Sequence, residues 1–367
     1  MNLTVAARGE HTSPASDTLM RRTSPSLRLP LFAVFLSLSV ISLLPLVVYG
    51  CASKKERIFR KSKILMDTLV TISVVARSPS EADKAVDAAF LEIERLEKMG
   101  NFYSADSELS RVNRDAGISP VTVSPDLIDL VTKALVVSRK TDGAFDPTIG
   151  PVISLYDFRA RKIPDPEAIR KSLPLVGYRK IRVDDTASTI FLTEKGMSID
   201  LGGIMKGYAA EKATEVLRSQ GIRAGIVSVA GDVRAFGAKP DGSPWKVGIR
   251  HPRGRSEEDV IAVLPLTDLS ISTSGDYERF SLREGKRIHH LISPQTGYPV
   301  STCQSASVIA PSGALADAYS TGVFLLGVER GLRLLETLGF EGVIVDDKGA
   351  LHATPGIRRV LEIKTGS

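Results

Sequence analysis

The sequence contains few of the residues that cross-link small domains or bind nucleic acids. It has only two cysteines, Cys51 and Cys303, among 367 residues, so at most one intramolecular disulfide can form. The formal charge is +6, from 48 basic and 42 acidic residues. No basic block with interleaved aromatic residues, the pattern that follows a phosphate backbone, is found. We therefore expect no nucleic-acid partner.

The chain also lacks internal repeats, and no long linker rich in Pro, Gly or Ser divides it after Cys51. Its composition, 43% hydrophobic and 25% charged, is typical of a globular protein. We predict a tether over residues 52–61 and one folded domain over residues 62–367.

An apolar, uncharged run over residues 29–51 ends at Cys51 and follows a leader that contains Arg21, Arg22 and Arg28. This pattern predicts an export signal over residues 1–51. The run is about long enough to span a bilayer, but Pro30 and Pro45 interrupt it.

The end of this run, "VVYGC", resembles a bacterial lipobox, whose cysteine carries lipid and becomes the first mature residue. Tyr49 is bulky for its position, so an uncleaved membrane anchor is the alternative. If Cys51 carries lipid, no disulfide can form, and we expect Cys303 to be a small buried hydrophobic residue.

Helical and strand-like segments alternate along the mature chain, which predicts an α+β fold. One amphipathic helix is expected over residues 80–99, with a capping-box-like start at Ser80 and Asp83. Another begins at Ser124 with Pro125 in its first turn. The expected strands are Leu69–Ala76, Gly225–Gly231, Trp245–Ile249 and Ser305–Ala310.

Two glycine-containing segments carry charged residues in turns. In "GAFDPTIGPV" (143–152), Asp146 either caps the backbone of a turn or contacts a ligand. In "SIDLGGIMKGYAAEKATEVLRSQG" (198–221), a short strand is expected to end at Asp200, and a glycine turn leads into a helix. Lys206 lies in the first helical turn, where a cation is unfavourable unless an anion is bound. The alternative is a solvated surface lysine.

Two later segments offer hydroxyl and carboxylate oxygens. In "ISTSGDYERF" (271–280), Thr273 and Ser274 offer two hydroxyls, and Tyr277 could stack on a flat ring or fill the core. In "ALADAYSTGVFLLG" (314–327), Asp317 and Thr321 are one helical turn apart, with Ser320 beside them. Such oxygens suit Mg²⁺, although a buried aspartate bonded to its neighbours has the same sequence pattern.

The segment "HHLISPQTGYPV" (289–300) places two adjacent histidines before a turn-rich loop. An imidazole at such a position could act as a general base near neutral pH. It could equally be the polar end of a strand.

Eight ordered blocks between Met66 and Gly327 resemble the ApbE family of FAD:protein FMN transferases. They are "MDTLVTI", "FYSADSELSRVN", "GAFDPTIGPV", "IDLGGIMKGYAAE", "VAGDVRAFG", "TSGDYERF", "HHLISPQTGYPV" and "ADAYSTGVFLLG". The resemblance implies a single ApbE-like, T-fold-related domain that binds FAD and Mg²⁺. It also implies transfer of FMN to Ser or Thr of redox proteins, such as subunits of RNF or NQR-type pumps, by an enzyme lipid-anchored on the periplasmic side of the inner membrane.

The resemblance also implies roles for particular residues. Around FAD it places Met66, Tyr103, Ala144, Phe145, Asp146, Asp200, Lys206, Thr273 and Ile292. Around the metal it places Asp317, Ser320, Thr321 and the carbonyl of Gly203.

His290 aligns with the family's histidine, and we expect it to take the proton of the acceptor hydroxyl as AMP leaves, with Mg²⁺ spreading the charge. His289 is expected to be a flanking residue, and Asp276 is the alternative base. Ser293 stands where the family usually has Asp. An FAD pyrophosphatase, releasing FMN and AMP, and a flavin-binding lipoprotein are the alternative functions.

Overall fold

A computed structural model of the chain describes residues 55–158, 163–256, 258–283 and 286–364. The predicted signal segment, Cys51 and the first residues of the tether lie outside these ranges. Within the described ranges, an eight-stranded antiparallel sheet has the order β1-β2-β6-β7-β10-β13-β14-β15. Its strands are β1 (Arg57–Leu65), β2 (Thr68–Ala76), β6 (Gly225–Val229), β7 (Asp232–Phe236), β10 (Ser270–Gly275), β13 (Cys303–Ala310), β14 (Glu341–Asp346) and β15 (Leu351–Ala353).

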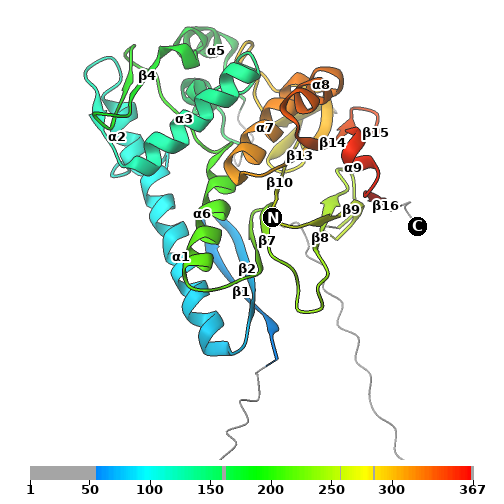
Figure 1. Cartoon of the computed structure of the whole chain (residues 1–367). Coiled ribbons are helices and arrows are strands. Elements are labelled where there is room, and N and C mark those ends of the chain that lie inside the picture. Colours follow the sequence, from blue (N-terminus) through cyan, green and yellow to red (C-terminus); the bar gives the residue numbers. More distant parts are fainter. Residues whose placement is uncertain (1–54, 159–162, 257, 284–285, 365–367) are drawn as a thin grey trace, which may run out of the picture. The chain divides into compact units, whose positions relative to one another are not determined.

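Helices cover one face of this sheet, and α1 and α6 run side by side there (Figure 1). The helices on this face are α1 (Pro79–Gly100), α6 (Met205–Ser219), α7 (Gly313–Leu326) and α8 (Val328–Leu338). Alternate residues of each strand face them: Val227 of β6 belongs to the helical core, whereas its neighbour Ile226 belongs to a second core on the opposite face. The second core is closed by a small sheet of order β16-β9-β8. Its strands are β8 (Trp245–Arg250), β9 (Val260–Leu266) and β16 (Glu362–Ile363).

Helix α3 (Pro125–Lys140) contacts α7. The remaining α-helices are short: α2 (Glu108–Arg114), α4 (Gly150–Ile153), α5 (Pro166–Ser172) and α9 (Pro355–Arg358). A three-stranded sheet contains β3 (Val121–Thr122), β5 (Thr189–Leu192) and β4 (Ile181–Asp184). The hairpin of β11 (Phe280–Arg283) and β12 (Lys286–His289) leads directly into His290. None of the helices in the described part of the chain combines the length and apolar character needed to cross a membrane.

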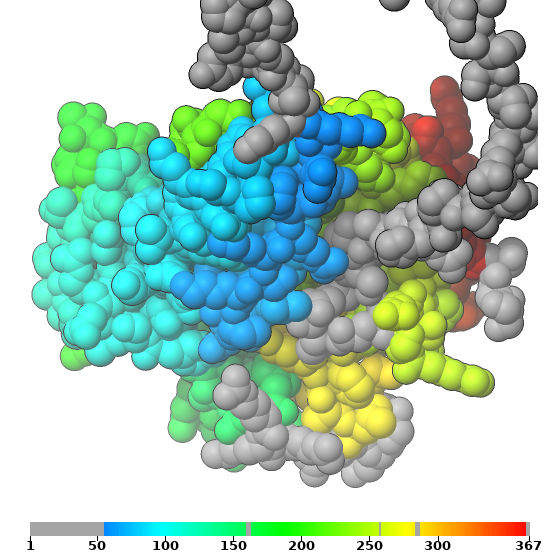
Figure 2. Space-filling view, turned by 90° about the horizontal axis from the view of Figure 1, so that it is seen from below, coloured from blue at the N-terminus to red at the C-terminus, as the bar shows by residue number. Residues whose placement is uncertain are grey.

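Strand β1 forms one edge of the main sheet and lies on the surface beside α1 (Figure 2). Its lysines pair with acidic residues of α1: Lys61 lies 2.9 Å from Asp83, and Lys63 contacts Glu94. Charged side chains of this kind protect a sheet edge from pairing with other chains.

The α+β class is confirmed, and so are the starts of several elements. Helix α3 begins at Pro125, and Ser124 caps it by accepting the N–H of Leu127. Helix α1 begins at Pro79, however, and its cap is Ser78 rather than Ser80. The Ser78 hydroxyl accepts the N–H of Glu81 at 3.2 Å, and Pro79 in the first turn needs no partner for a backbone N–H.

Two expected boundaries were wrong. Strand β1 begins at Arg57, which pairs with Ala76 of β2, so residues 57–61 belong to the sheet rather than to a tether. The segment ending at Asp200 is not a strand. Its backbone is instead held by the side-chain amide of Asn113, which donates to the Ile199 carbonyl and accepts the Ile199 N–H, at 3.0 and 2.7 Å.

Helices α6 and α7 cross at two glycines. A Cβ built on Gly207 would lie 2.0 Å from the carbonyl oxygen of Gly313, and one built on Gly313 would lie 2.2 Å from that of Gly207. The helices also cap each other. Glu211 accepts the Ser312 hydroxyl at 2.6 Å, and Asp317 accepts the Gly207 N–H at 3.0 Å.

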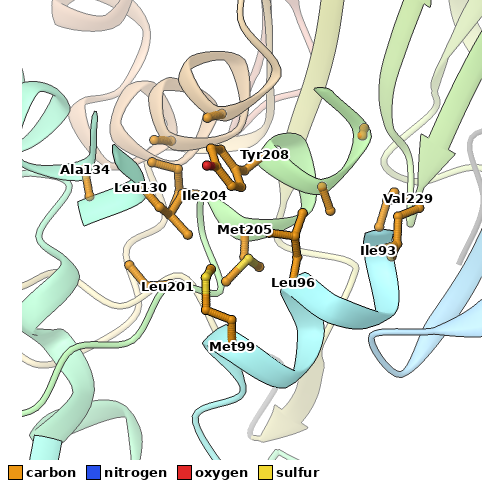
Figure 3. Packing of buried hydrophobic residues seen from close by; sticks show 14 of the residues in the cluster. Ile93, Leu96, Met99, Leu130, Ala134, Leu201, Ile204, Met205, Tyr208 and Val229 are labelled. Atoms are coloured by element: carbon orange, nitrogen blue, oxygen red, sulfur yellow. The ribbon is translucent and has the colours of Figure 1, made fainter. Parts of the chain in front are cut away.

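Apolar side chains fix the start of α6 on its other side. Figure 3 shows Met205 pointing towards Leu96 and Met99 of α1, with Ile204 and Tyr208 also buried in this cluster. The first turn of α6 is therefore held by the core of α1 and by α7 together.

We expect Gly207→Ala to lower the free energy of unfolding by about 1 to 3 kcal/mol, because the added methyl group overlaps the Gly313 carbonyl. Alanine would otherwise be favoured over glycine in a helix by about 1 kcal/mol. Urea unfolding measures the change. Ser219→Ala at the exposed end of α6 is the control and should stay within about 0.5 kcal/mol of the parent. A Gly207→Ala variant as stable as the parent would contradict this crossing.

Candidate active site

The candidate site lies at one end of the main sheet, where the register brings several strand ends together. Val70 near the start of β2 pairs with Val229 at the end of β6, and a two-residue turn then leads to Asp232. Strand β10 runs antiparallel to β7 and ends at Gly275 on the same side. The first turn of α6 and the middle of α7 lie over this end.

Lys206, in the first turn of α6, faces two carboxylates. Its ammonium contacts Asp232 Oδ2 and lies 3.9 Å from Asp317 Oδ1. Burial alone lowers the pKa of Lys206, but the charges of Asp232 and Asp317 outweigh it and hold the pKa above its usual value. The anion expected near this cation is therefore supplied by the chain itself, and Lys206 is not a solvated surface lysine.

Asp232 is a member of the site that the sequence did not reveal. It follows Ala230 and Gly231, whose φ values of 51° and 93° form a tight hairpin turn, and it is 2% exposed. The only signal was a carboxylate directly after a strand-like run that contains a glycine. Its pairing with Lys206, 26 positions earlier, depends on the fold.

Asp317 is almost fully buried, at 3% exposed, and its pKa is raised by burial and then by the charge of Asp232, against the opposing effect of Lys206. Beside it, the Ser274 hydroxyl lies 2.8 Å from the Ser320 hydroxyl and 3.0 Å from that of Thr321. The structure thus brings together the three α7 residues expected around a metal and adds Ser274 of β10.

Thr273 does not join this group. Successive side chains of a strand point to opposite faces, so Thr273 turns away from α7, and its hydroxyl lies 2.7 Å from that of Ser307. Gly203 is close, because a Cβ there would lie 3.3 Å from Thr321 Oγ1 and 3.2 Å from the Phe145 ring.

The residues present fit a hard divalent cation such as Mg²⁺. They offer a buried carboxylate and hydroxyl oxygens, and the absence of a side chain at Gly203 lets the backbone approach Thr321. Within the described ranges, no group of three or more His, Cys, Asp or Glu side chains could hold a metal. Two carboxyl groups face one ammonium here, and Glu278 also acts on Lys206, so the surroundings favour a bound cation.

The two adjacent histidines have different environments. His289 is 2% exposed; its Nε2 lies 2.7 Å from the Val300 carbonyl, its Nδ1 accepts the Leu291 N–H, and its ring packs edge-on against Phe324. His289 is therefore a structural residue. His290 Nδ1 is buried without a hydrogen-bond partner. Burial, with smaller contributions from Arg279 and His289, lowers the pKa of His290 to about 3.

Ser293 and Gln295 hold the loop after His290 by hydrogen bonds. The Ser293 hydroxyl donates to Gln295 Oε1 at 2.9 Å, and Gln295 Nε2 donates to the Gly143 carbonyl at 3.1 Å. Asp276, the alternative base, is held by two hydrogen bonds of 2.7 Å from Arg253. It is therefore engaged in an ion pair.

The two aspartates expected around FAD, Asp146 and Asp200, accept hydrogen bonds from backbone N–H groups of loops. Asp146 is buried and accepts three hydrogen bonds, two from Thr148 and one from the Tyr178 N–H, so the backbone-capping interpretation is correct. Asp200 accepts the Gly202 N–H at 2.7 Å, and its own N–H donates to the Pro147 carbonyl. Burial raises the pKa of both carboxyls.

The other residues expected around FAD occupy varied positions. Met66 lies in the tight turn between β1 and β2, at the end of the sheet where Asp232 lies. Ala144, Phe145 and Ile292 are buried, whereas Tyr103 is 83% exposed and contacts the Phe102 ring.

Comparison with known proteins gives a consistent result. The model of the ApbE family matches residues 66–344. The FAD:protein FMN transferase of Treponema pallidum is 32% identical over 329 residues, which cover 84% of this chain and 91% of that protein. The protein of the same name from Salmonella typhimurium is 32% identical over 77% of this chain and 83% of its own.

Solved structures agree. The ApbE protein of Thermotoga maritima is 30% identical with a TM-score of 0.77, covering 83% of this chain and 99% of that one. The apo form of Pseudomonas stutzeri flavinyl transferase ApbE is 27% identical with a TM-score of 0.74, covering 85% and 98%.

We expect the His290 imidazole to stay neutral from pH 8 down to pH 5, because its folded-state pKa lies far below the usual value of about 6.5. The unfolded chain takes up this proton near pH 6.5 and the folded chain does not. The contribution of His290 to stability is therefore present above pH 6.5 and is lost as the pH falls.

The measurement is a pH series of histidine ring ¹⁵N spectra, with the His290 signals identified by their absence from His290→Gln. The same protein in urea is the control and should titrate near 6.5. A His290 signal that titrates near 6.5 in the folded protein would show that the imidazole is solvated.

Proposed function

The chain belongs to the ApbE family, and we propose that it is an FAD:protein FMN transferase, as its relatives are named. The observation that carries the proposal is the group of Lys206, Asp317, Ser320 and Thr321 at the sheet end, near enough to His290 for the charge of Lys206 to contribute to lowering the pKa of that imidazole. A cation, oxygen ligands for a metal and a neutral imidazole are the groups that phosphoryl transfer requires.

In the proposed reaction, a Ser or Thr hydroxyl of an acceptor protein attacks the FMN-side phosphorus of FAD. The new phosphoester bond forms as the bond to the bridging oxygen breaks, and AMP leaves with that oxygen. The proton of the attacking hydroxyl passes to His290, which is neutral at physiological pH. His290 Nδ1 is buried without a hydrogen-bond partner, which leaves this nitrogen available for the proton.

Two positively charged groups would offset the negative charge of the pyrophosphate: the Lys206 ammonium and the Mg²⁺ that Asp317 would help to hold. Asp317, Ser320 and Thr321, with the Gly203 carbonyl, would hold Mg²⁺, which when bound supplies positive charge to the phosphate oxygens. Lys206 stays protonated beside its carboxylates and contributes a fixed positive charge at the start of α6. Both charges favour the developing negative charge on the leaving AMP.

We further propose that the acceptors are redox proteins, such as subunits of RNF or NQR-type pumps. The apolar run that ends at Cys51 supports export and lipid attachment. The enzyme would then be tethered on the periplasmic side of the inner membrane, on the same side as acceptors that are themselves exposed there.

The test is incubation of the mature protein with FAD, MgCl₂ and a candidate acceptor protein. We expect the acceptor to gain the mass of FMN minus one water, and AMP to appear in equal amount, because one phosphoester replaces one pyrophosphate bond. Intact-protein mass spectrometry and chromatography of nucleotides measure the two products. Release of free FMN and AMP without acceptor labelling would make the protein a pyrophosphatase instead.

Three variants accompany this assay. His290→Gln should lose about 10²- to 10⁴-fold in transfer rate while still binding FAD. Asp317→Asn keeps an oxygen for the Gly207 N–H but removes the charge, so it should lose turnover more than FAD affinity. His352→Gln in strand β15 is the matched control and should be unchanged. His289 is unsuitable as a control because its ring is buried and hydrogen-bonded.

The proposed lipid anchor has its own test. Cys51→Ala should yield an unlipidated precursor that the lipoprotein peptidase leaves uncleaved, because only the thiol can accept the diacylglycerol. The mass of the amino-terminal peptide reports both effects, whereas the uncleaved precursor keeps its apolar run and partitions into detergent with or without lipid. Cys303→Ala should keep the lipid, since that thiol is buried in the fold. A Cys51→Ala protein with the same amino terminus as the parent would show that the signal is an uncleaved anchor.

A further inference from the structure

We propose that Asp232 is a positioning residue: it holds the Lys206 ammonium away from Asp317 and so keeps Asp317 free to bind the divalent cation. This inference rests on the proposed metal site. Asp232 itself is not among the proposed metal ligands.

The geometry around Lys206 is asymmetric. The ammonium makes a direct hydrogen-bonded contact with Asp232 Oδ2, whereas its separation from Asp317 Oδ1 is 3.9 Å, beyond hydrogen-bonding distance. These are the carboxylates of the described chain that lie within 4.0 Å of Lys206 Nζ. The Lys206 ammonium is therefore hydrogen-bonded to Asp232, and it interacts with Asp317 only through its charge.

Asp317 keeps acceptor capacity for a metal. Its Oδ2 accepts the Gly207 N–H at 3.0 Å, and the Lys206 N–H also donates to this carboxylate, which leaves about two of its roughly four lone-pair positions. Oδ1 is the oxygen nearest the Lys206 ammonium. An ammonium that moved onto this oxygen would occupy one of the positions left for the cation.

The backbone fixes Asp232 in the position that prevents this movement. Asp232 begins β7 directly after the tight turn of Ala230 and Gly231, and Val229 pairs with it across that turn. The side chain is short and 2% exposed, so its carboxylate has little freedom. Lys206 has a long, flexible side chain, and its position is set by Asp232 rather than the reverse.

Charge accounting leads to the same conclusion. With Asp232 present, the single ammonium of Lys206 faces Asp232 and Asp317, with Glu278 as a further acidic group near it, and this acidic surrounding attracts a cation. In Asp232→Asn one acidic group is lost, and the ammonium has Asp317 as its remaining carboxylate within 4.0 Å. We expect the half-buried ammonium, left without its partner, to move to that carboxylate, because an unpaired charge shielded from water is unfavourable.

The test measures binding of Mg²⁺ alone to the purified protein by calorimetry, without FAD. We expect Asp232→Asn to raise the Kd for Mg²⁺ by about 10- to 100-fold, as for other residues that orient metal ligands. Asp126→Asn, which removes a carboxylate paired with Arg95, is the matched control and should bind Mg²⁺ like the parent. Parental Mg²⁺ affinity in Asp232→Asn would overturn the role of Asp232, whereas a parent that binds no Mg²⁺ would overturn the proposed metal site as well.

A double-mutant cycle separates positioning from simple loss of charge. If Asp232 acts through Lys206, the variant Lys206→Met with Asp232→Asn should bind Mg²⁺ within about twofold of Lys206→Met alone. If Asp232 acts only through its own negative charge, the loss caused by Asp232→Asn persists in the Lys206→Met background, and the proposal fails.

The parent protein provides a second measurement that does not depend on a variant that folds. In a crystal structure with Mg²⁺ bound, the Lys206 ammonium should remain on Asp232 while Asp317 Oδ1 contacts the metal. Lys206 bonded to Asp317 in that structure would overturn the proposal. In Asp232→Asn without metal, Lys206 is expected on Asp317 Oδ1.

Discussion

The contact between Gly207 and Gly313 is the constraint on which the candidate site depends. It lets α6 and α7 come close enough for each helix to accept a hydrogen bond from the start of the other. Glu211 of α6 accepts the Ser312 hydroxyl at the start of α7, and Asp317 of α7 accepts the Gly207 N–H in the first turn of α6. Helix starts carry unpaired N–H groups, and α6 has no cap from its own N-cap residue, Ile204. A carboxylate from α7 therefore replaces the missing cap. The same carboxylate is the one that the site needs for chemistry, so stability and function share a single side chain.

This arrangement gives a physical reason for the charges around it. A lysine in the first turn of a helix opposes the helix dipole, and burial adds a further penalty. Lys206 is stabilised there because Asp232 and Asp317 lie beside it. Burial, and then the charge of Asp232, raises the pKa of Asp317. Each charge is thus stabilised by the others, and the acidic groups around the single ammonium leave room for a cation.

Features governed by neighbouring residues could be predicted from the sequence. The cap at Ser124, the helical spacing of Asp317, Ser320 and Thr321, and the burial of Cys303 all follow from local patterns. Ordered motifs identified the family. A local pattern can also place a helix start wrongly by a residue or two. Ser80 matches the pattern of an N-cap, but Ser78 is the N-cap of α1.

Features governed by distant residues could not be predicted. Asn113 supports the Ile199 backbone from 86 positions away, so an apparent strand is a loop held by a side-chain amide. Ser274 rather than Thr273 reaches α7 because the strand register decides which face each residue takes.

The different environments of His289 and His290 also depend on the fold rather than on neighbouring residues. The strand-end interpretation is confirmed for His289, which is buried at the end of β12. The general-base role of His290, whose Nδ1 has no hydrogen-bond partner, stays a prediction. Ser293 closes the following loop through Gln295 onto Gly143. The loop is thus held by hydrogen bonds of Ser293 and Gln295, while burial is the main cause of the low pKa of His290.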